Sequence, residues 1–285
     1  MGYDILINGS INGAFYALLA LGFCLMFGVA RLVNLYHGSY YMLAAYFTYL
    51  FAVLLRWPLL LAVAASLSGV VAVAILVDRV CVNRVRQSSI AVMICTLGLA
   101  YFTQYLVRIL FGPRYLSIPA FVSGNAGILG VVIPSTRLLA FGVGIGLILA
   151  LWAFIGKTRA GRSIMAVAQD PEAATYMGIN TAAAFTMATG ISAFLAGVAG
   201  TVVAPFLSVD PGMWLLPLIK AFAIVILGGL GSLWGSVLAA FLLGYLETGV
   251  SLLLSTNVRE IVFLAVVLLV LIIKPSGLLG KSLTA

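Results

Sequence analysis

Long blocks of apolar residues alternate with short polar or basic segments along the chain. About 20 apolar residues are enough for a helix to cross the hydrocarbon core of a bilayer. Within the blocks, polar and apolar positions do not alternate as they do in the strands of an outer-membrane barrel. The pattern predicts helical membrane segments at about 5–29, 40–55, 59–77, 90–110, 138–155, 182–205, 217–254 and 258–273.

The seventh block is too long for one membrane-spanning helix, and it contains Gly228, Gly229 and Gly231 near its middle. We therefore expect a short helix, a break at these glycines and a second helix. The predicted fold is an all-α membrane helix bundle of about eight to ten membrane segments. A single transmembrane domain covers residues 1–285.

Pairs of small residues at four-residue spacing also occur in the apolar blocks. Such spacing lets the backbones of two helices approach closely in lipid. The pairs are Gly9 with Gly13, Gly142 with Gly146, Ala193 with Gly197, and Gly231 with Gly235. We expect each pair to lie at a contact between helices.

The composition excludes several classes of protein. Of the 285 residues, 64% are hydrophobic and 8% are charged, whereas an average soluble domain is about 25% charged. So little charge excludes a soluble enzyme, a nucleic-acid-binding protein and a secreted disulfide scaffold. His37 is the one histidine, and Cys24, Cys81 and Cys95 are isolated from one another in the sequence. We therefore expect no catalytic, cofactor-binding or metal-binding residue in this chain.

The net charge of +8 comes from basic residues that gather in two connections, 78–89 and 156–180. These basic residues are Arg79, Arg84, Arg86, Lys157, Arg159 and Arg162. Cytoplasmic loops of membrane proteins carry such an excess of lysine and arginine. Two predicted spans separate the connections, so both can face the cytoplasm, with the N-terminus outside. Lys274 and Lys281 favour a cytoplasmic C-terminus.

The segment before the first apolar block contains Asp4 and no lysine or arginine. It lacks the basic region of a cleavable signal peptide, so we expect the first block to be retained as a span. The longest outer connection, residues 112–137, is rich in glycine, proline and serine. It predicts a compact cap rather than a folded domain, so any energy-converting module must be another polypeptide.

A short helix is predicted inside the second cytoplasmic connection. Asp170 is a good N-cap, Pro171 suits the first helical position, and Glu172 favours the positive end of the helix dipole. Gly178 supplies a left-handed stop. The residues that continue the helix between these ends are Ala173, Ala174 and Met177. So short a helix needs a surface to dock against, which is either the membrane surface or a groove on a cytoplasmic partner.

A few polar residues interrupt the apolar runs. Asn34, His37 and Gly38 lie between two apolar blocks, where a break in a helix frees backbone groups to line a polar path. The alternative places His37 at the membrane–water interface. A charge at mid-bilayer costs roughly 2.5–3.5 kcal/mol on insertion scales, so Lys220 and Glu247 should pair or face water.

The alternative for Lys220 is that its ammonium group reaches the outer interface, whereas Glu247 is expected to be internal. We expect Arg259 and Glu260 to lie at a membrane boundary and to stabilise each other weakly. The hypothetical translocation path then consists of Asn34, His37, Gly38, Lys220, Gly228, Gly229, Gly231 and Glu247.

Several motifs occur in a characteristic order over nearly the whole chain. They are Asn34-Leu35-Tyr36-His37-Gly38, 41–43, 161–180, 195–200, 210–213, 220–222, 228–232 with Gly235, and 275–280. With these motifs the chain resembles the inner-membrane permeases of branched-chain amino acid ABC importers, the LivH-like subunits. One departure is Ser39, where the family often has an acidic residue.

The resemblance implies a permease subunit in a bacterial inner membrane and several partners. These are a second, homologous permease, two ATPase subunits that bind the ATP, and a periplasmic substrate-binding protein. The resemblance also implies that the helix from Asp170 to Met177 is the coupling helix, which inserts into an ATPase subunit. Beyond these proteins and the lipid bilayer we expect no nucleic-acid partner.

Two other kinds of transporter stay open on the sequence. Importers of urea and short amides use similar permeases, so the motifs do not decide the substrate. A gradient-driven secondary transporter would need intramembrane carboxylates for ion coupling, and Glu247 is the one good candidate. An intramembrane enzyme is disfavoured, because the sequence offers neither a paired-histidine motif nor a clear nucleophile and base.

Overall fold

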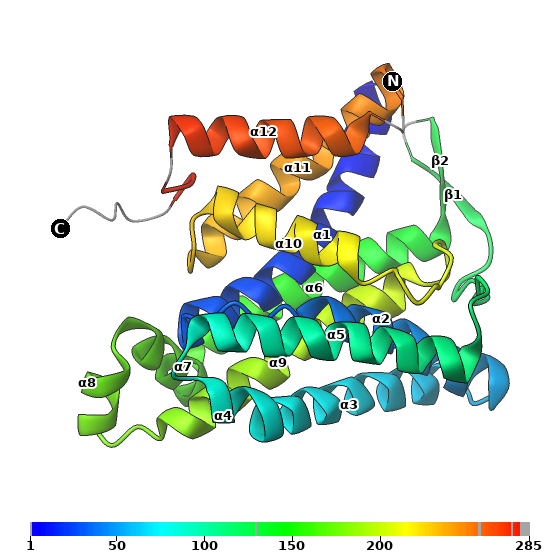
Figure 1. Cartoon of the computed structure of the whole chain (residues 1–285). Coiled ribbons are helices and arrows are strands. Elements are labelled where there is room, and N and C mark those ends of the chain that lie inside the picture. Colours follow the sequence, from blue (N-terminus) through cyan, green and yellow to red (C-terminus); the bar gives the residue numbers. More distant parts are fainter. Residues whose placement is uncertain (1, 129, 256–257, 275, 280–285) are drawn as a thin grey trace.

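The computed structural model describes residues 2–128, 130–255, 258–274 and 276–279. Pro275 and Gly280 of the last sequence motif, and Lys281, lie outside the described residues. Helices make up most of the described chain (Figure 1). They are α1 (Gly2–Ala30), α2 (His37–Thr48), α3 (Leu59–Val77), α4 (Asn83–Val85), α5 (Ser89–Phe111), α6 (Ser135–Lys157), α7 (Arg159–Gln169), α8 (Pro171–Tyr176), α9 (Thr181–Val203), α10 (Leu215–Gly228), α11 (Leu233–Leu253) and α12 (Arg259–Ile273).

Two π-helical turns extend this set: η1 (Tyr49–Leu54) continues α2, and η2 (Asp78–Val82) joins α3 to α4. Six helices of the described chain are long and apolar enough to cross a membrane, namely α1, α3 with its extension to Val85, α5, α6, α9 and α11. The shorter α2 with η1, α10 and α12 cover the other apolar blocks. The prediction of an all-α membrane bundle is confirmed.

The predicted break inside the seventh apolar block is also confirmed, because α10 ends at Gly228 and α11 begins at Leu233. Gly229 and Gly231 take φ values of +103° and +83°, a region that glycine enters without steric cost. A Cβ on Gly228 would overlap the backbone of Gly235, so the two helices can approach this closely only with glycine at that point.

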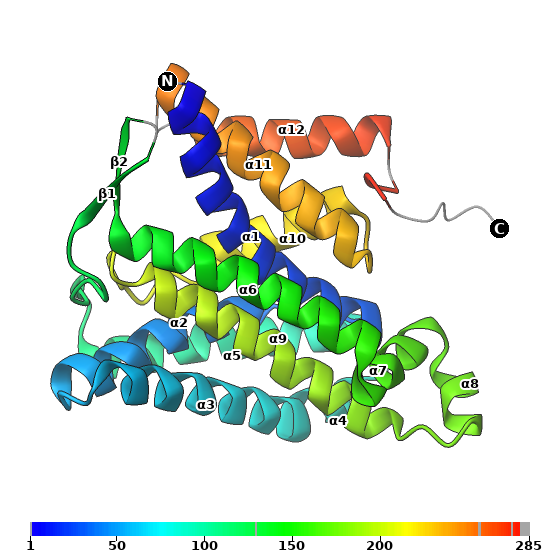
Figure 2. The same ribbon diagram turned by 180° about the vertical axis from the view of Figure 1, so that it is seen from behind.

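Helix α1 runs diagonally through the bundle and contacts α6, α9, α10 and α11 (Figures 1 and 2). A helix that is apolar on all sides is expected to be buried, and Leu18 and Leu21 of α1 are fully buried. Gly9 and Gly13 face α11, where a Cβ on either residue would overlap Tyr245 or Phe241. The predicted contact of this small-residue pair is confirmed.

Helices α2, α3, α5 and α9 lie on one side of α1, and helices α10, α11 and α12 lie on the other (Figure 1). The predicted contact at Gly142 and Gly146 is wrong within the described chain, because both residues are exposed and have open space beside them. Gly144, on another face of α6, packs against Ala14 instead. The spacing predicted a close contact on this helix but not the face that makes it.

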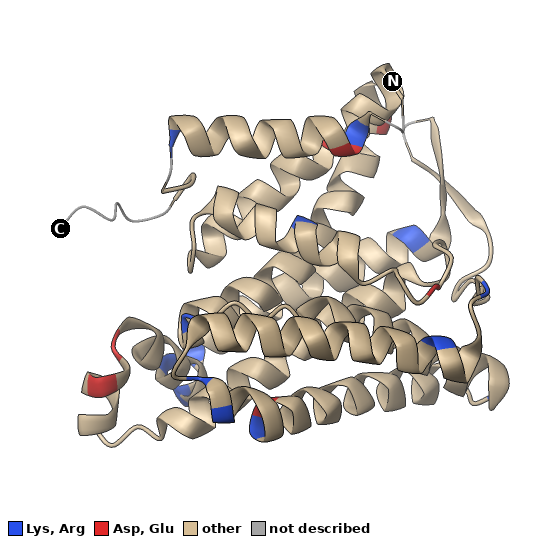
Figure 3. Cartoon of the chain, viewed as in Figure 1, with Lys and Arg blue, Asp and Glu red and all other residues tan. Residues whose placement is uncertain are grey.

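The two ends of the bundle differ. One end carries α4, α7 and α8, and the basic residues after α3 and α6 gather there (Figure 3). The two basic connections therefore lie at the same end, as predicted. The other end carries an antiparallel hairpin of β1 (Asn125–Ile128) and β2 (Val131–Pro134), which forms part of the predicted cap. Leu116 of this cap pairs through its backbone with Val209, in the loop between α9 and α10.

Candidate functional site

A cavity with a volume of about 690 Å³ within the described chain bears several charged and polar groups. It lies toward the hairpin end, since the first turn of α6 and the loop between α9 and α10 both contribute to its wall. Its charged and polar lining residues are Asn12, Tyr16, Tyr41, Arg137, Ser208, Asp210, Lys220, Glu247, Arg259 and Glu260. Its apolar lining includes Phe15, Leu19, Val203, Phe206, Met213 and Leu216.

Lys220 of α10 and Glu247 of α11 meet at this cavity, and this pairing is one of the two arrangements that the sequence left open for Lys220. The Lys220 Nζ atom donates to Glu247 Oε1 at 2.9 Å, and both side chains are buried. Tyr16 of α1 donates its hydroxyl hydrogen to the other carboxylate oxygen of Glu247 and accepts a hydrogen bond from Lys220 Nζ at 3.1 Å. Pairing of this kind is what makes a buried charge tolerable in a membrane bundle.

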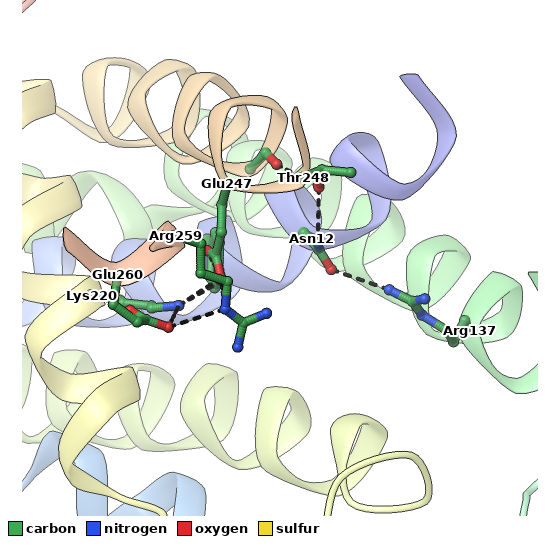
Figure 4. A network of polar contacts seen from close by, with 9 residues as sticks. Asn12, Arg137, Lys220, Glu247, Thr248, Arg259 and Glu260 are labelled. Carbon is green, nitrogen blue, oxygen red and sulfur yellow. Dashed lines mark hydrogen bonds and ion pairs between the residues drawn. The ribbon is translucent and has the colours of Figure 1, made fainter. Parts of the chain in front are cut away.

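Arg259 and Glu260, at the start of α12, extend this pair into a network of four charges (Figure 4). Lys220 lies 3.1 Å from Glu260, and Arg259 lies 3.4 Å from both Glu247 and Glu260. Each cation thus touches both carboxylates, and the charges of the four side chains sum to zero. The weak Arg259–Glu260 pair predicted from the sequence is present, but it belongs to a larger network that ties α12 to α10 and α11.

Two further charges line the cavity outside this network. Arg137 donates through Nη1 to Asn8 Oδ1 and through Nη2 to Asn12 Oδ1, both at 3.2 Å. Asn12 in turn donates to Thr248 (Figure 4). Asp210 accepts a hydrogen bond from the Gly212 backbone N–H at 2.8 Å. Across the described residues, neither Arg137 nor Asp210 has an oppositely charged side chain within ion-pair distance.

The sequence-based path did not include Arg137, Asp210 or Asn12. In the sequence, Arg137 ends the outer cap and has the position of an ordinary charge that flanks a membrane span. Asp210 precedes Pro211 and Gly212 and has the position of a turn residue. The sequence feature that could have indicated this part of the cavity is the pair Asn8 and Asn12 within the first apolar block, because polar side chains inside a membrane helix usually face protein or water.

The structure places Asn34, His37 and Gly38 in the packed interior, away from this cavity. The Asn34 side chain accepts from the Tyr36 N–H and shapes the turn before α2. His37 donates from Nε2 to the Leu19 carbonyl oxygen, and its Nδ1 accepts from the Ser192 hydroxyl, each at 3.1 Å. His37 thereby connects α2 to α1 and α9.

Gly38 allows close packing, because a Cβ there would crowd Trp214 and Leu218 at the start of α10. Gly228 and Gly229 form the turn between α10 and α11. Gly231 lines a second cavity of about 290 Å³, together with Trp152, Met165 and Trp234. Of the eight residues of the hypothetical path, the structure brings Lys220 and Glu247 together at the 690 Å³ cavity and leaves the other six elsewhere.

The short helix predicted after Gln169 is present as α8. Asp170 is its N-cap and accepts from the N–H groups of Glu172 and Ala173 at 2.9 and 3.0 Å. The helix ends at Tyr176, with Met177 at the C-cap and Gly178 at φ +79°. The local signals in the sequence therefore predicted this helix to within one residue.

One side of α8 packs and the other is open. Ala174 is buried, whereas Tyr176 and Met177 are 89% and 83% exposed. Helix α7, which the sequence-based interpretation left as part of the connection, precedes α8 and contacts α1, α6 and α9. Arg31, just after α1, donates to the Gln169 carbonyl oxygen at the end of α7 at 3.1 Å. Helix α1 thus reaches from the cavity to the segment that carries α8.

The whole chain matches known proteins. Residues 5–271 match the family model described as the permease component of the branched-chain amino acid transport system. The permease protein LivH of the high-affinity branched-chain amino acid transport system of Escherichia coli K12 is 31% identical over 96% of this chain and 94% of its own length. The corresponding permease protein BraD of Pseudomonas aeruginosa is 31% identical over 97% of this chain and 95% of its own.

A solved structure shares the fold. PsaBC from Streptococcus pneumoniae in complex with Fab superposes with a TM-score of 0.55 and 12% identity, over 95% of this chain and 92% of that chain. At this identity the likeness concerns the fold alone. The family match covers almost every helix described above, and the relatives align over their full length. The chain therefore belongs to the family of permease components of branched-chain amino acid transport systems.

Proposed function

We propose that this chain is the permease subunit of an ATP-driven importer of branched-chain amino acids in a bacterial inner membrane. The observation that carries the proposal is the match of residues 5–271 to the permease family, with relatives aligned from end to end. The chain contributes the path for the solute and no chemistry of its own. ATP would be bound by partner subunits.

The complete importer would contain a second, homologous permease, two ATPase subunits on the cytoplasmic side and a periplasmic binding protein. The exposed face of α8 supports an ATPase partner, because a helix of 6 residues that presents Tyr176 and Met177 to the outside is suited to a groove on another protein. The basic residues around α4 and α7 support a cytoplasmic location for this end.

In this proposal, α8 receives the movement of the ATPase subunits and α1 carries it to the cavity. The Arg31–Gln169 hydrogen bond joins α1 to the end of α7, and Tyr16 of α1 contacts both Lys220 and Glu247. Lys220 and Glu247 would line the path, whereas Asn34, His37, Gly38, Gly228, Gly229 and Gly231 would support it by packing or by turn geometry. A shift of α1 would then change the shape of the cavity.

Uptake by the assembled importer tests this function. The chain is co-expressed with its second permease, ATPase subunits and binding protein from the same organism and reconstituted in liposomes, and uptake of radiolabelled leucine is measured. We expect uptake that requires ATP and the binding protein and that an ionophore does not abolish. Liposomes with this chain alone serve as the control and should show no ATP-driven uptake.

Three results would contradict the proposal. Uptake driven by an ion gradient without ATP would indicate a secondary transporter. ATP-driven uptake of urea but not of leucine would indicate an importer of neutral amides. Concentrative uptake by the chain alone would remove the need for ATPase partners.

A further inference from the structure

We infer that Arg137 and Asp210 are the two charged anchors of a binding site for a zwitterionic α-amino acid within the 690 Å³ cavity. Arg137 would bind the α-carboxylate and Asp210 the α-ammonium group. This inference rests on the proposed function and deepens it, because it assigns the recognition of the transported solute to two residues of the permease itself.

The distribution of charge around the cavity is the first argument. The lining contains three cations and three anions, of which Lys220, Arg259, Glu247 and Glu260 neutralise one another within 3.4 Å. Among the lining residues, Arg137 and Asp210 remain as one cation and one anion that face the same cavity without a charged partner. A zwitterion is the class of solute that supplies one complementary charge to each of them.

The environment of Arg137 orients its guanidinium group without neutralising it. Both partners, Asn8 and Asn12, are neutral amides, and each accepts one hydrogen bond. A guanidinium group has five N–H donors in a planar fork, so donors remain for a carboxylate. The centroid of the Phe206 ring lies 5.7 Å from the Arg137 Cζ atom, so the ring covers one side of the guanidinium group. A partly buried cation held in this way is stabilised by a bound anion.

Asp210 is fixed in a similar manner. Its Oδ1 atom accepts the Gly212 N–H, while Oδ2 makes no hydrogen bond within the described chain. The backbone pairing of Leu116 with Val209, at 2.9 Å in both directions, holds the residue before Asp210 against the cap. The carboxylate therefore has a free acceptor at a defined position, which an ammonium group can use.

The rest of the wall suits an aliphatic side chain. Phe15 and Phe206 pack with their ring centroids 5.6 Å apart, and Leu19, Met213 and Leu216 complete an apolar surface. Burial of a branched aliphatic side chain against such a surface is favourable, because it removes apolar area from water. A neutral solute such as urea would leave both anchors unmatched, so the site should discriminate against it.

Competition binding tests the two anchors separately. The complex of this chain with its second permease and its ATPase subunits, without the binding protein, is placed in nanodiscs and loaded with tritiated leucine. The competitors are isocaproate, which is leucine without its amino group, and isoamylamine, which is leucine without its carboxylate. We expect the unmodified complex to bind leucine about tenfold or more tightly than either analogue, since a charged site rejects a ligand that leaves its partner unpaired.

A variant of either anchor should lose the preference for leucine over one of the two analogues and keep the preference over the other. In Arg137→Gln, leucine and isoamylamine should bind within about threefold of each other, because the carboxylate no longer has a cationic partner. In Asp210→Asn, which keeps the acceptor for the Gly212 N–H, leucine and isocaproate should become similar instead. Arg137→Lys should restore the preference over isoamylamine. The matched controls Arg108→Gln and Asp4→Asn lie outside the cavity lining and should behave as the unmodified complex.

If Arg137 and Asp210 only supported the fold, their variants would yield less active complex, but the remaining complex would keep its preference for leucine over the two analogues. The inference is overturned if both variants discriminate among the three compounds as the unmodified complex does, or if the unmodified complex binds no leucine at millimolar concentration. It is also overturned if the variants act only when the binding protein is present, which would make the two residues a docking contact. Leucine uptake by the unmodified importer, measured in parallel, separates these outcomes from a failure of the proposed function.

Discussion

Single residues in this protein show how a membrane bundle accommodates charge. Lys220 and Glu247 are each isolated in an apolar run of sequence, yet they are buried in contact with each other and with Tyr16. The ion pair replaces part of the hydration that each charge loses on burial. Three helices, α1, α10 and α11, are joined at this point, so the residues that interrupt the apolar pattern also fix the packing around the cavity.

Removing one member of the pair should destabilise the fold. We expect Lys220→Met to lower the free energy of unfolding by about 3–5 kcal/mol, because it leaves the buried Glu247 carboxylate with the more exposed Arg259 as its one cationic partner among the described residues. Denaturant unfolding in detergent would measure this loss. Lys274→Met is the matched control, since Lys274 is exposed, and should change stability by less than about 0.5 kcal/mol.

The double substitution Lys220→Met with Glu247→Gln provides the complementary measurement. Because it removes both charges, it should recover part of the stability that Lys220→Met loses, which appears as non-additivity in a double-mutant cycle. Equal stability of Lys220→Met and Lys274→Met would show that the pair does not hold the helices together.

At the scale of single elements, α8 is the clearest case of a segment defined by its own sequence. Asp170 caps it, Pro171 begins it and Gly178 ends it, while Ala174 is its one buried residue. With so little core of its own, the helix leaves Tyr176 and the adjoining Met177 exposed. Helix α7 and the Arg31–Gln169 hydrogen bond connect it to α1.

Truncating the exposed side of α8 should uncouple the importer. We expect Met177→Ala and Glu172→Gln to lower leucine uptake per ATP hydrolysed, by about thirtyfold for Met177→Ala, because a buried anchor of an interface contributes about 2 kcal/mol. ATPase activity and uptake are measured together in proteoliposomes. Arg114→Gln, exposed at the other end of the bundle, is the control. Unchanged coupling in both α8 variants would contradict the proposed docking.

At the scale of the whole molecule, the charge distribution gives the bundle two distinct ends. The basic residues of the connections 78–89 and 156–180 gather with α8 at one end, and the hairpin and the cavity lie toward the other (Figure 3). Lysine and arginine stay on the cytoplasmic side during insertion, so the asymmetry sets the orientation. Under the proposed function, this asymmetry would place the cavity toward the outside and α8 toward the ATPase subunits.

Labelling of single cysteines tests this orientation. In a background with Cys24, Cys81 and Cys95 replaced by alanine, Tyr115→Cys and Tyr176→Cys introduce thiols at positions that are 76% and 89% exposed. A membrane-impermeant maleimide should label Tyr115→Cys in right-side-out vesicles and Tyr176→Cys in inverted vesicles. The reverse pattern would show that α8 faces the periplasm and would exclude an ATPase partner for it.

The amino-acid sequence by itself determined those features that depend on neighbouring residues. Hydrophobic block length defined the helices, the glycines at 228–231 defined the break between α10 and α11, and Asp170 to Gly178 defined α8. The basic residues of the two connections predicted that both connections lie at the same end of the bundle. Each of these follows from local backbone preference or from the transfer of one segment into lipid, and neither requires knowledge of distant residues.

The tertiary structure alone decided which residues meet. Spacing on α6 could not show that Gly144 rather than Gly142 faces α1, because several faces of a membrane helix are equally apolar. Sequence also could not show that Arg137 and Asp210, 73 positions apart by their numbers, line one cavity. That cavity exists because α1 crosses the bundle between α6, α9 and α10, and such a crossing is the sum of many weak packing contacts between distant segments.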